Sequence, residues 1–157
     1  MGTTSSKIAP RHHSKHSIRR IFLGGACGST TWRQALIPVL ESKGIEYYNP
    51  QVPDGTWHAG LMAEELYEKE VMCDTLLFVI GSETRGIASM VEAAYYAGTK
   101  NVLLVIEPYP EDGLHAYALA CAVDVNRGRT YLRQLAENKS NTNIRLFESV
   151  LDVGLYL

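Results

Sequence analysis

The chain has 157 residues and a mass of 17.4 kDa, which is the size of a single domain. Its residues are 46% hydrophobic and 20% charged, as in globular proteins, and no stretch approaches the roughly 20 apolar residues that span a bilayer. The three cysteines Cys27, Cys73 and Cys121 are odd in number and lack a zinc-type spacing. We therefore expect a reduced intracellular protein without a bound metal.

The net charge of −2 conceals an uneven distribution. Residues 1–20 contain five Lys and Arg and no acid, whereas the other 137 residues contain 10 basic and 17 acidic side chains. Contact with nucleic-acid phosphates depends on clustered Lys and Arg. The acidic body is therefore expected not to bind a DNA or RNA duplex.

Residues 1–18 are polar, rich in Ser, Thr and His, and without apolar periodicity, which predicts a disordered basic arm before a single domain at residues 19–157. The first seven residues fit the pattern for N-myristoylation at Gly2. One acyl chain binds a membrane weakly, and the cations that follow would add attraction to an anionic leaflet. This pattern predicts a cytoplasmic protein held at the cytoplasmic face of a membrane; the alternative is a solubilising tail.

Beyond the arm, short apolar runs alternate with helical periodicity. The predicted strands are residues 21–23 (ending in Gly24-Gly25), 45–48, 76–80, 102–106 and 144–147. The predicted helices are residues 29 or 30 to 43 with a kink at Pro38, 59–72, 90–97, 114–138 with Gly128 as its weak point, and a short terminal helix. This alternation predicts an α/β fold with a doubly wound, flavodoxin- or Rossmann-like, mostly parallel five-stranded sheet covered by helices on both faces.

Ligands of such sheets bind beyond the carboxyl ends of the strands, which selects the loops at residues 24–32, 49–58 and 81–89. The first loop is rich in glycine and precedes a helix start with free N–H groups, although glycines placed for packing alone are the alternative. It lacks both the G-x-G-x-x-G pattern and the Lys-Ser/Thr of a P-loop, which disfavours a nicotinamide-dependent dehydrogenase. Cys27 beside that helix start is a candidate nucleophile, although no His accompanies it in the sequence.

In the third loop, Ser89 and Glu92 have the spacing of a capping box, which could by itself account for both residues. The same position in the first helical turn would keep the Glu92 carboxylate ionised at the ligand-binding edge, as attack on an anomeric carbon requires. Both interpretations stay open. On the second loop, Trp57 either stacks on a base or covers the core.

Several segments together resemble the nucleoside 2-deoxyribosyltransferase-like superfamily over about residues 20–150. They are residues 21–25, 74–80, 92–98 and 102–106, with Thr31-Trp32-Arg33, Tyr48-Asn49-Pro50 and the segment from Asp124 to Arg129 indicating a divergent branch related to deoxynucleoside monophosphate N-glycosidases. The resemblance implies a helix-borne nucleophile at Glu92 that attacks the sugar C1′. It also implies a proton donor at Glu65, whose spacing to Asp74 differs from the family's by one residue, or at the neighbouring Glu64.

Typical members carry an aspartate about six residues before the nucleophile, where this chain has Gly86 between Arg85 and Ser89. A serine, an arginine and a helix start suit a phosphate better than a free 5′-hydroxyl. The residues expected to hold sugar, base or phosphate are Gly24, Gly25, Cys27, Gly28, Trp32, Asn49, Trp57, Arg85, Ser89 and Asn126. Asp124, Asn126, Arg127 and Arg129 would reach the site or a subunit contact, or else form a solvated helix face.

The sequence therefore predicts cleavage or transfer at the N-glycosidic bond of a (deoxy)nucleoside or its 5′-monophosphate, without a cofactor. The alternatives are a catalytically degenerate, membrane-tethered nucleotide-binding or signalling module and, less favoured, a glycohydrolase of NAD. The resemblance also implies a homo-oligomer, for which Tyr117, Tyr131, Asn126 and Arg127 are candidate surface residues.

Overall fold

The computed structural model describes residues 17–53, 55–56, 58–138 and 143–157. The predictions that concern Gly2, the arm up to residue 16 and Trp57 therefore lie outside the described residues.

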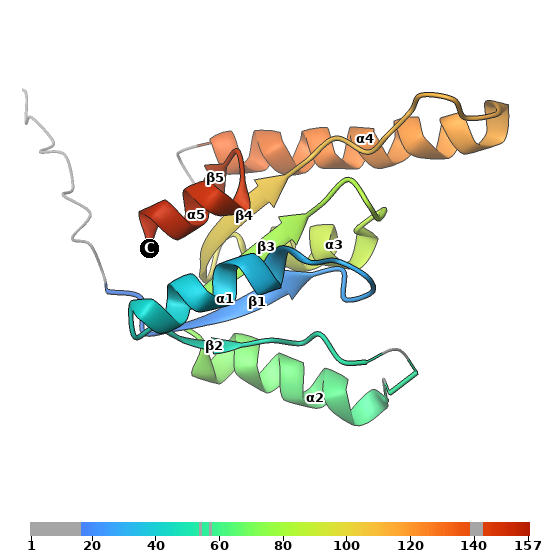
Figure 1. The fold of residues 1–157 in the computed structure, drawn as a ribbon. Helices are drawn as coiled ribbons and strands as arrows, with labels where there is room; N and C mark the ends of the chain where they lie inside the picture. Colours follow the sequence, from blue (N-terminus) through green and yellow to red (C-terminus); the bar gives the residue numbers. More distant parts are fainter. Residues whose placement is uncertain (1–16, 54, 57, 139–142) are drawn as a thin grey trace, which may run out of the picture.

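All five predicted strands are present and form one parallel sheet in the order β2-β1-β3-β4-β5, which is flavodoxin-like (Figure 1). The strands are β1 (Arg20–Gly25), β2 (Glu46–Tyr48), β3 (Thr75–Ile80), β4 (Asn101–Ile106) and β5 (Ile144–Phe147). Every residue of β3 is buried, as expected of a central strand whose two faces are both covered. The chain reverses its direction of winding between β1 and β3, and the carboxyl ends of these strands therefore border the expected ligand site.

Helices cover both faces of the sheet, as predicted (Figure 1). They are α1 (Trp32–Ser42), α2 (Ala59–Tyr67), α3 (Ile87–Tyr96), α4 (Ala116–Glu137) and α5 (Val150–Tyr156). One apolar core joins α1 and α5 to the side chains of Leu23, Leu77 and Leu103. The other joins α3 and α4 to Phe22 and Phe78, and it is on this second face that the acidic candidates lie.

Two of the helix predictions need correction. Helix α4 runs unbroken through Gly128, which lies next to the Met90 side chain of α3. Helix α1 begins at Trp32 without a side-chain cap from Thr31, and it contains Pro38 within its length. Its predicted stop is confirmed, because Gly44 follows the helix with a φ of 67°.

Helix α2 continues directly into a single π-helical turn, Glu68–Met72. The Cys73 N–H donates to the Glu68 carbonyl at 2.8 Å, five residues back, where an α-helix would bond four residues back. The turn buries the side chains of Glu68 and Lys69 next to each other, whereas neighbouring positions of an ordinary helix face different directions. Glu68 pairs with Arg20, and Lys69 points into the candidate site.

Candidate functional site

Two acidic side chains from different helices converge on one buried ammonium group. Lys69 is 5% exposed, and its Nζ donates a hydrogen bond to Glu92 Oε1 from α3. The same Nζ lies 3.9 Å from Glu65 Oε2 on α2 and 5.1 Å from the centre of the Phe22 ring. Glu65 and Glu92 are thus brought together as the sequence predicted, while Lys69, which the prediction did not include, lies between them.

The two carboxylates differ in their electrostatics. Burial raises the pKa of Glu65, and nearby Glu92 raises it further, against the opposing effect of Lys69. Glu92, by contrast, has a direct hydrogen-bonded ion pair with the ammonium. A carboxyl with a raised pKa next to one that is paired with an ammonium is the arrangement that acid and nucleophile roles require.

The π turn bears on the choice between Glu65 and Glu64. The π turn Glu68–Met72 lies between Glu65 and Asp74, and a π turn accommodates one additional residue in a helix. Glu65 faces Lys69, whereas the Glu64 side chain is exposed. Glu64 still acts on this edge, because it contributes, after burial, to raising the pKa of Tyr48 to about 12.

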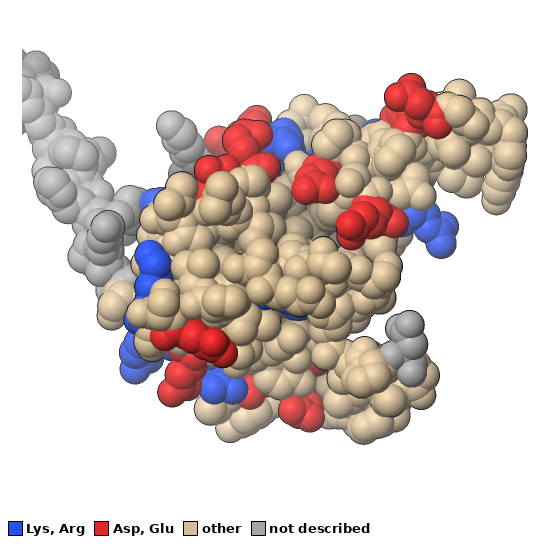
Figure 2. Space-filling view, viewed as in Figure 1, with Lys and Arg blue, Asp and Glu red and all other residues tan. Residues whose placement is uncertain are grey.

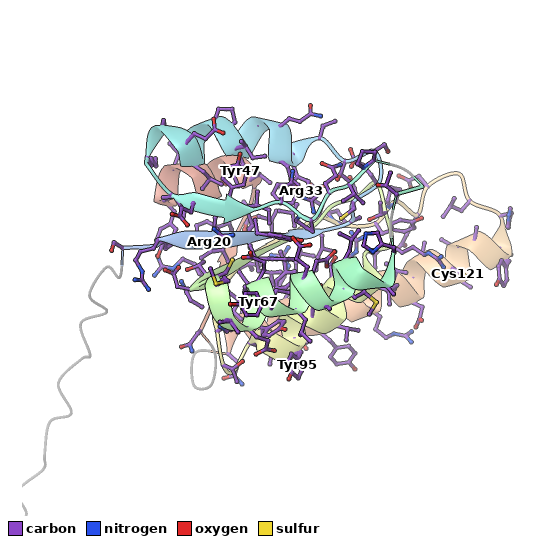
Figure 3. The ribbon with its side chains drawn as sticks, turned by 90° about the horizontal axis from the view of Figure 1, so that it is seen from below. Arg20, Arg33, Tyr47, Tyr67, Tyr95 and Cys121 are labelled. Carbon is purple, nitrogen blue, oxygen red and sulfur yellow. The ribbon has the colours of Figure 1, made fainter. Side chains whose placement is uncertain are left out.

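The first loop is shaped by a fully buried arginine. The Arg33 guanidinium donates to the Leu23 carbonyl at 2.9 and 3.1 Å, to the Gly25 carbonyl at 3.1 Å and to the Ala26 carbonyl at 3.0 Å. It lies between α1 and the sheet (Figure 3) and stacks on Trp32, with its central carbon 4.4 Å from the ring centre. Trp32, predicted to bind substrate, therefore packs against the residue that fixes the loop.

A side-chain amide completes the loop from the other side. Gln51 Nε2 donates to the carbonyls of Cys27 at 2.7 Å, Gly28 at 2.9 Å and Thr30 at 3.0 Å. Its backbone N–H is accepted by Asn49 Oδ1 at 3.0 Å, so the predicted ligand Asn49 shapes the turn that carries Gln51. The carbonyls of the first loop therefore accept hydrogen bonds from protein side chains.

The glycines of this loop have different roles. A Cβ at Gly24 would lie 2.6 Å from the Phe78 ring, and one at Gly25, which has a φ of 142°, would lie 2.6 Å from the Val79 carbonyl oxygen. Packing against β3 therefore requires both residues, as the alternative interpretation proposed. A Cβ at Gly28 would meet nothing within 4 Å, so space beside Gly28 is open to a ligand.

Cys27 lies at the same edge, in surroundings that favour its neutral thiol form. Burial raises its pKa, and the nearby Glu65 and Glu92 carboxylates raise it further. Its Sγ lies 3.7 Å from the carbonyls of Gly25 and Pro50, with which it can form only weak hydrogen bonds. This environment disfavours the thiolate that a nucleophilic cysteine needs.

The capping-box interpretation of the third loop is wrong. Helix α3 begins at Ile87, its N-cap is Gly86 in the left-handed region (φ 66°), and no side chain caps it. Ser89 is therefore already inside the helix, and Glu92 lies in the second turn rather than the first, with Lys69 as its partner. The sequence could not reveal this, because a positive φ at Gly86 leaves no periodic signal.

Gly86 also has a geometric reason to replace the family's aspartate. A Cβ there would lie 3.0 Å from Ile80 Cγ2, in a backbone conformation that L side chains rarely adopt. Beside it, Ser89 is 7% exposed at the uncapped helix start. Arg85 is exposed, and no other described residue pairs with its side chain.

A second buried arginine, Arg129 on α4, fixes this third loop. Its guanidinium donates to the carbonyls of Gly81 at 3.1 Å and Thr84 at 2.6 Å, and also to the Glu107 carbonyl. Asn126, predicted to bind substrate, instead forms two hydrogen bonds with the Tyr109 backbone. Asn126 Oδ1 accepts from the Tyr109 N–H at 2.8 Å, and Asn126 Nδ2 donates to the Tyr109 carbonyl at 2.9 Å.

Further features of the described part of the chain concern metal ligands, membrane-spanning helices and charged surfaces. No group of three or more His, Cys, Asp and Glu there could hold a metal ion. No helix in the described ranges is long and apolar enough to cross a membrane. On the face drawn in Figure 2, acidic side chains are scattered among uncharged ones without a continuous basic surface.

The fold and these loops define a flavodoxin-like α/β domain with an acidic pair at the carboxyl edge of its sheet. The family described as "Nucleoside 2-deoxyribosyltransferase like" matches residues 18–109, and the chain belongs to this family. The matched range contains Glu65, Lys69 and Glu92. The resemblance predicted from the sequence is thereby confirmed, while the role of each residue is not addressed by the match.

Among solved structures, the chain is similar to a conserved protein from Enterococcus faecalis V583. The two are 17% identical with a TM-score of 0.56, over 88% of this chain and 96% of the other. This likeness concerns the fold alone. No curated protein matches the chain.

Proposed function

We propose that the protein cleaves or transfers the N-glycosidic bond of a (deoxy)nucleoside or its 5′-monophosphate. The observation that carries the proposal is the convergence of Glu92 and Glu65 on Lys69 at the carboxyl edge of the sheet. Family membership supports a nucleoside or nucleotide as the ligand.

In this proposal Glu92 is the nucleophile. One of its carboxylate oxygens attacks C1′ of the sugar, and the bond between C1′ and the base nitrogen breaks. Glu65 donates its proton to the departing base, a role that its raised pKa supports. Water or a second base then takes the glycosyl group from Glu92.

The closeness of the two acids favours this two-step route. Oxygens of both carboxylates lie within 3.9 Å of the same Nζ atom. Enzymes in which water attacks directly keep their carboxyl groups roughly 6.5–9.5 Å apart to leave room for that water, whereas a closer pair is typical of enzymes that form a covalent glycosyl intermediate. Two acids that share one ammonium favour the second arrangement.

The start of α3 favours a substrate with a 5′-phosphate. Gly86 contributes no carboxylate, the helix start has no side-chain cap, and Arg85 and Ser89 stand beside it. Free N–H groups at a helix start together with an arginine suit an anion. We therefore expect monophosphates to be turned over with a lower KM than the corresponding nucleosides.

The competing function is a nucleotide-binding module without turnover, which the absent aspartate at Gly86 favours. Incubation with a panel of deoxynucleosides, their monophosphates and NAD separates the two. Base release by the wild type, lost in Glu92→Gln, supports the enzyme. Binding without base release from any substrate supports the module, and nicotinamide release alone would redirect the assignment to NAD.

We further propose that the protein forms a homo-oligomer. Exposed aromatic side chains lie on α3 and α4: Tyr95 is 70% exposed, Tyr117 78% and Tyr131 67%. The first part of α4 also extends beyond the sheet (Figure 1). Sedimentation at micromolar concentration should give a species larger than 17.4 kDa, and Tyr117→Asp should shift it toward the monomer. Sedimentation as a monomer alone would contradict the proposal.

A further inference from the structure

We propose that Lys69 is a positioning residue that exchanges carboxylate partners during turnover, pairing with Glu92 in the free enzyme and with Glu65 once Glu92 has become a glycosyl ester. The inference rests on the proposed function and assigns the site a third working residue. Lys69 itself forms no bond to the substrate.

The geometry of Lys69 gives it two unequal partners. Its Nζ forms a hydrogen bond with Glu92 Oε1. Glu65 Oε2 lies 3.9 Å from the same Nζ, just outside hydrogen-bonding distance. The side chain is 6% exposed, so water cannot readily replace a lost partner. A buried ammonium that loses one carboxylate is strongly driven toward another.

The charge changes during the reaction match this arrangement. In the first step Glu92 forms a bond to C1′ and loses its negative charge, while Glu65 gives its proton to the base and acquires one. In the second step Glu65 takes a proton from the attacking water, and the bond between C1′ and Glu92 breaks to restore the Glu92 carboxylate. In each state the site holds one carboxylate and one ammonium, and Lys69 needs to move only between two oxygens.

The contact has two consequences for the chemistry. Lys69 pairs with the Glu92 carboxylate before attack and occupies one of its oxygens, which leaves Oε2 for C1′. After the first step it stabilises the Glu65 carboxylate, which is the base that activates the acceptor. A lysine in the π turn thereby supports both halves of the reaction.

Other charged and titratable groups also face this cluster and enter any titration of it. They are Glu64 on α2, Tyr96 on α3, Arg33 on α1, Cys27 in the first loop and Tyr48 on β2. Among the residues that the structure describes, none of these groups forms a hydrogen bond with Lys69, so only Lys69 links the two acids directly.

The test uses Glu92→Gln as a neutral mimic of the ester and needs no turnover. Carbon-13 NMR of labelled glutamate carboxyls gives the pKa of Glu65 in the wild type, Glu92→Gln, Lys69→Met and the double variant. Losing the Glu92 charge lowers the pKa of Glu65 in any background. Partner exchange predicts that this drop is larger by about one pH unit when Lys69 is present than in Lys69→Met. Equal drops in both backgrounds would overturn the proposal.

Two further variants keep the test decisive. Lys100→Met is the matched control, because Lys100 Nζ donates to the Glu70 carbonyl at 2.7 Å, away from the acid pair, and the variant should leave the Glu65 titration unchanged. If Lys69→Met does not fold, Lys69→Gln replaces it in the same cycle. Failure of the wild type to release base overturns the proposed function, whereas an unchanged cycle in an active enzyme overturns only the role of Lys69.

Discussion

Two buried cations lie beside β1 on opposite faces of the sheet, and they have different kinds of partner. Arg33 is held by the backbone carbonyls of Leu23, Gly25 and Ala26. Lys69 is held by the carboxylates of Glu92 and Glu65. Carbonyls cannot gain or lose charge, so the Arg33 contacts stay constant and maintain a shape. Carboxylates can, so the Lys69 contacts can change as a reaction proceeds.

The comparison separates what each region contributes. The Arg33 region gives a rigid first loop in which Gln51 supplies a second set of hydrogen bonds to the loop carbonyls. The Lys69 region places one ammonium between two acids, of which Glu65 has a raised pKa. Substitutions in the Arg33 region should lower the stability of the fold, whereas substitutions in the Lys69 region should change the reaction.

The largest effect is expected for Glu92→Gln. An amide cannot attack C1′, so base release should fall by at least ~10³-fold. The amide oxygen can still accept a hydrogen bond from Lys69, so the stability loss should be only about 1 kcal/mol. Steady-state kinetics and thermal unfolding measure the two quantities. Base release at the wild-type rate would assign the nucleophile elsewhere.

Arg33→Met should affect stability most. It leaves the carbonyls of Leu23, Gly25 and Ala26 without their donor inside the protein, at a cost of at least about 3 kcal/mol. The Tm should fall by roughly 10 °C for a domain of this size. The matched control is Arg127→Met, because Arg127 is exposed and lies 3.6 Å from Asp124, and its Tm should stay within a few degrees. Similar losses in both variants would remove the special role of Arg33.

Gly25→Ala tests how tightly the same loop is packed. The added Cβ would lie 2.6 Å from the Val79 carbonyl oxygen at a φ of 142°. The free energy of unfolding should fall by about 2–4 kcal/mol. Gly28→Ala, where the Cβ meets nothing within 4 Å, should change it by less than about 0.5 kcal/mol. Chemical denaturation of the pair gives the difference, and equal values would contradict the packing account.

Glu65→Gln should produce a smaller, pH-dependent effect on stability. Because burial raises the pKa of Glu65 in the folded state, its ionisation disfavours folding as the pH rises through that value. Replacing it should stabilise the protein near neutral pH, with the gain disappearing below the ordinary carboxyl value of 4.5. Glu64→Gln, at an exposed position on the same helix, is the matched control. A gain that grows toward low pH would have the wrong sign.

The sheet could be predicted from the sequence because its strands are short, apolar and regularly spaced. The runs at β3 and β4 are buried throughout, so their hydrophobicity identifies them without knowledge of their neighbours. The acids Glu92 and Glu65 were found because the family resemblance placed them, and the fold then brought them together.

The remaining features depend on geometry that the sequence does not display. Lys69 follows Glu65 by four residues on a helix, a spacing that ordinarily indicates a solvated ion pair, and only the π turn buries it. Gly86 is the N-cap of α3 and has a positive φ, so the structure rules out the capping box that the spacing of Ser89 and Glu92 left open. For Arg129 the sequence leaves open the site, a subunit contact or a solvated helix face, and its burial against the third loop excludes the solvated face.

The central claim is that Glu92 forms a covalent bond to the sugar. The direct measurement is intact-protein and peptide mass spectrometry after incubation with a 2-fluoro-2-deoxy nucleoside and its monophosphate, whose glycosyl-enzyme breaks down slowly. The account predicts one added glycosyl group on the peptide that contains Glu92 in the wild type, and none in Glu92→Gln. Base release by the wild type with the adduct on another residue, or with an equal adduct in Glu92→Gln, would contradict it.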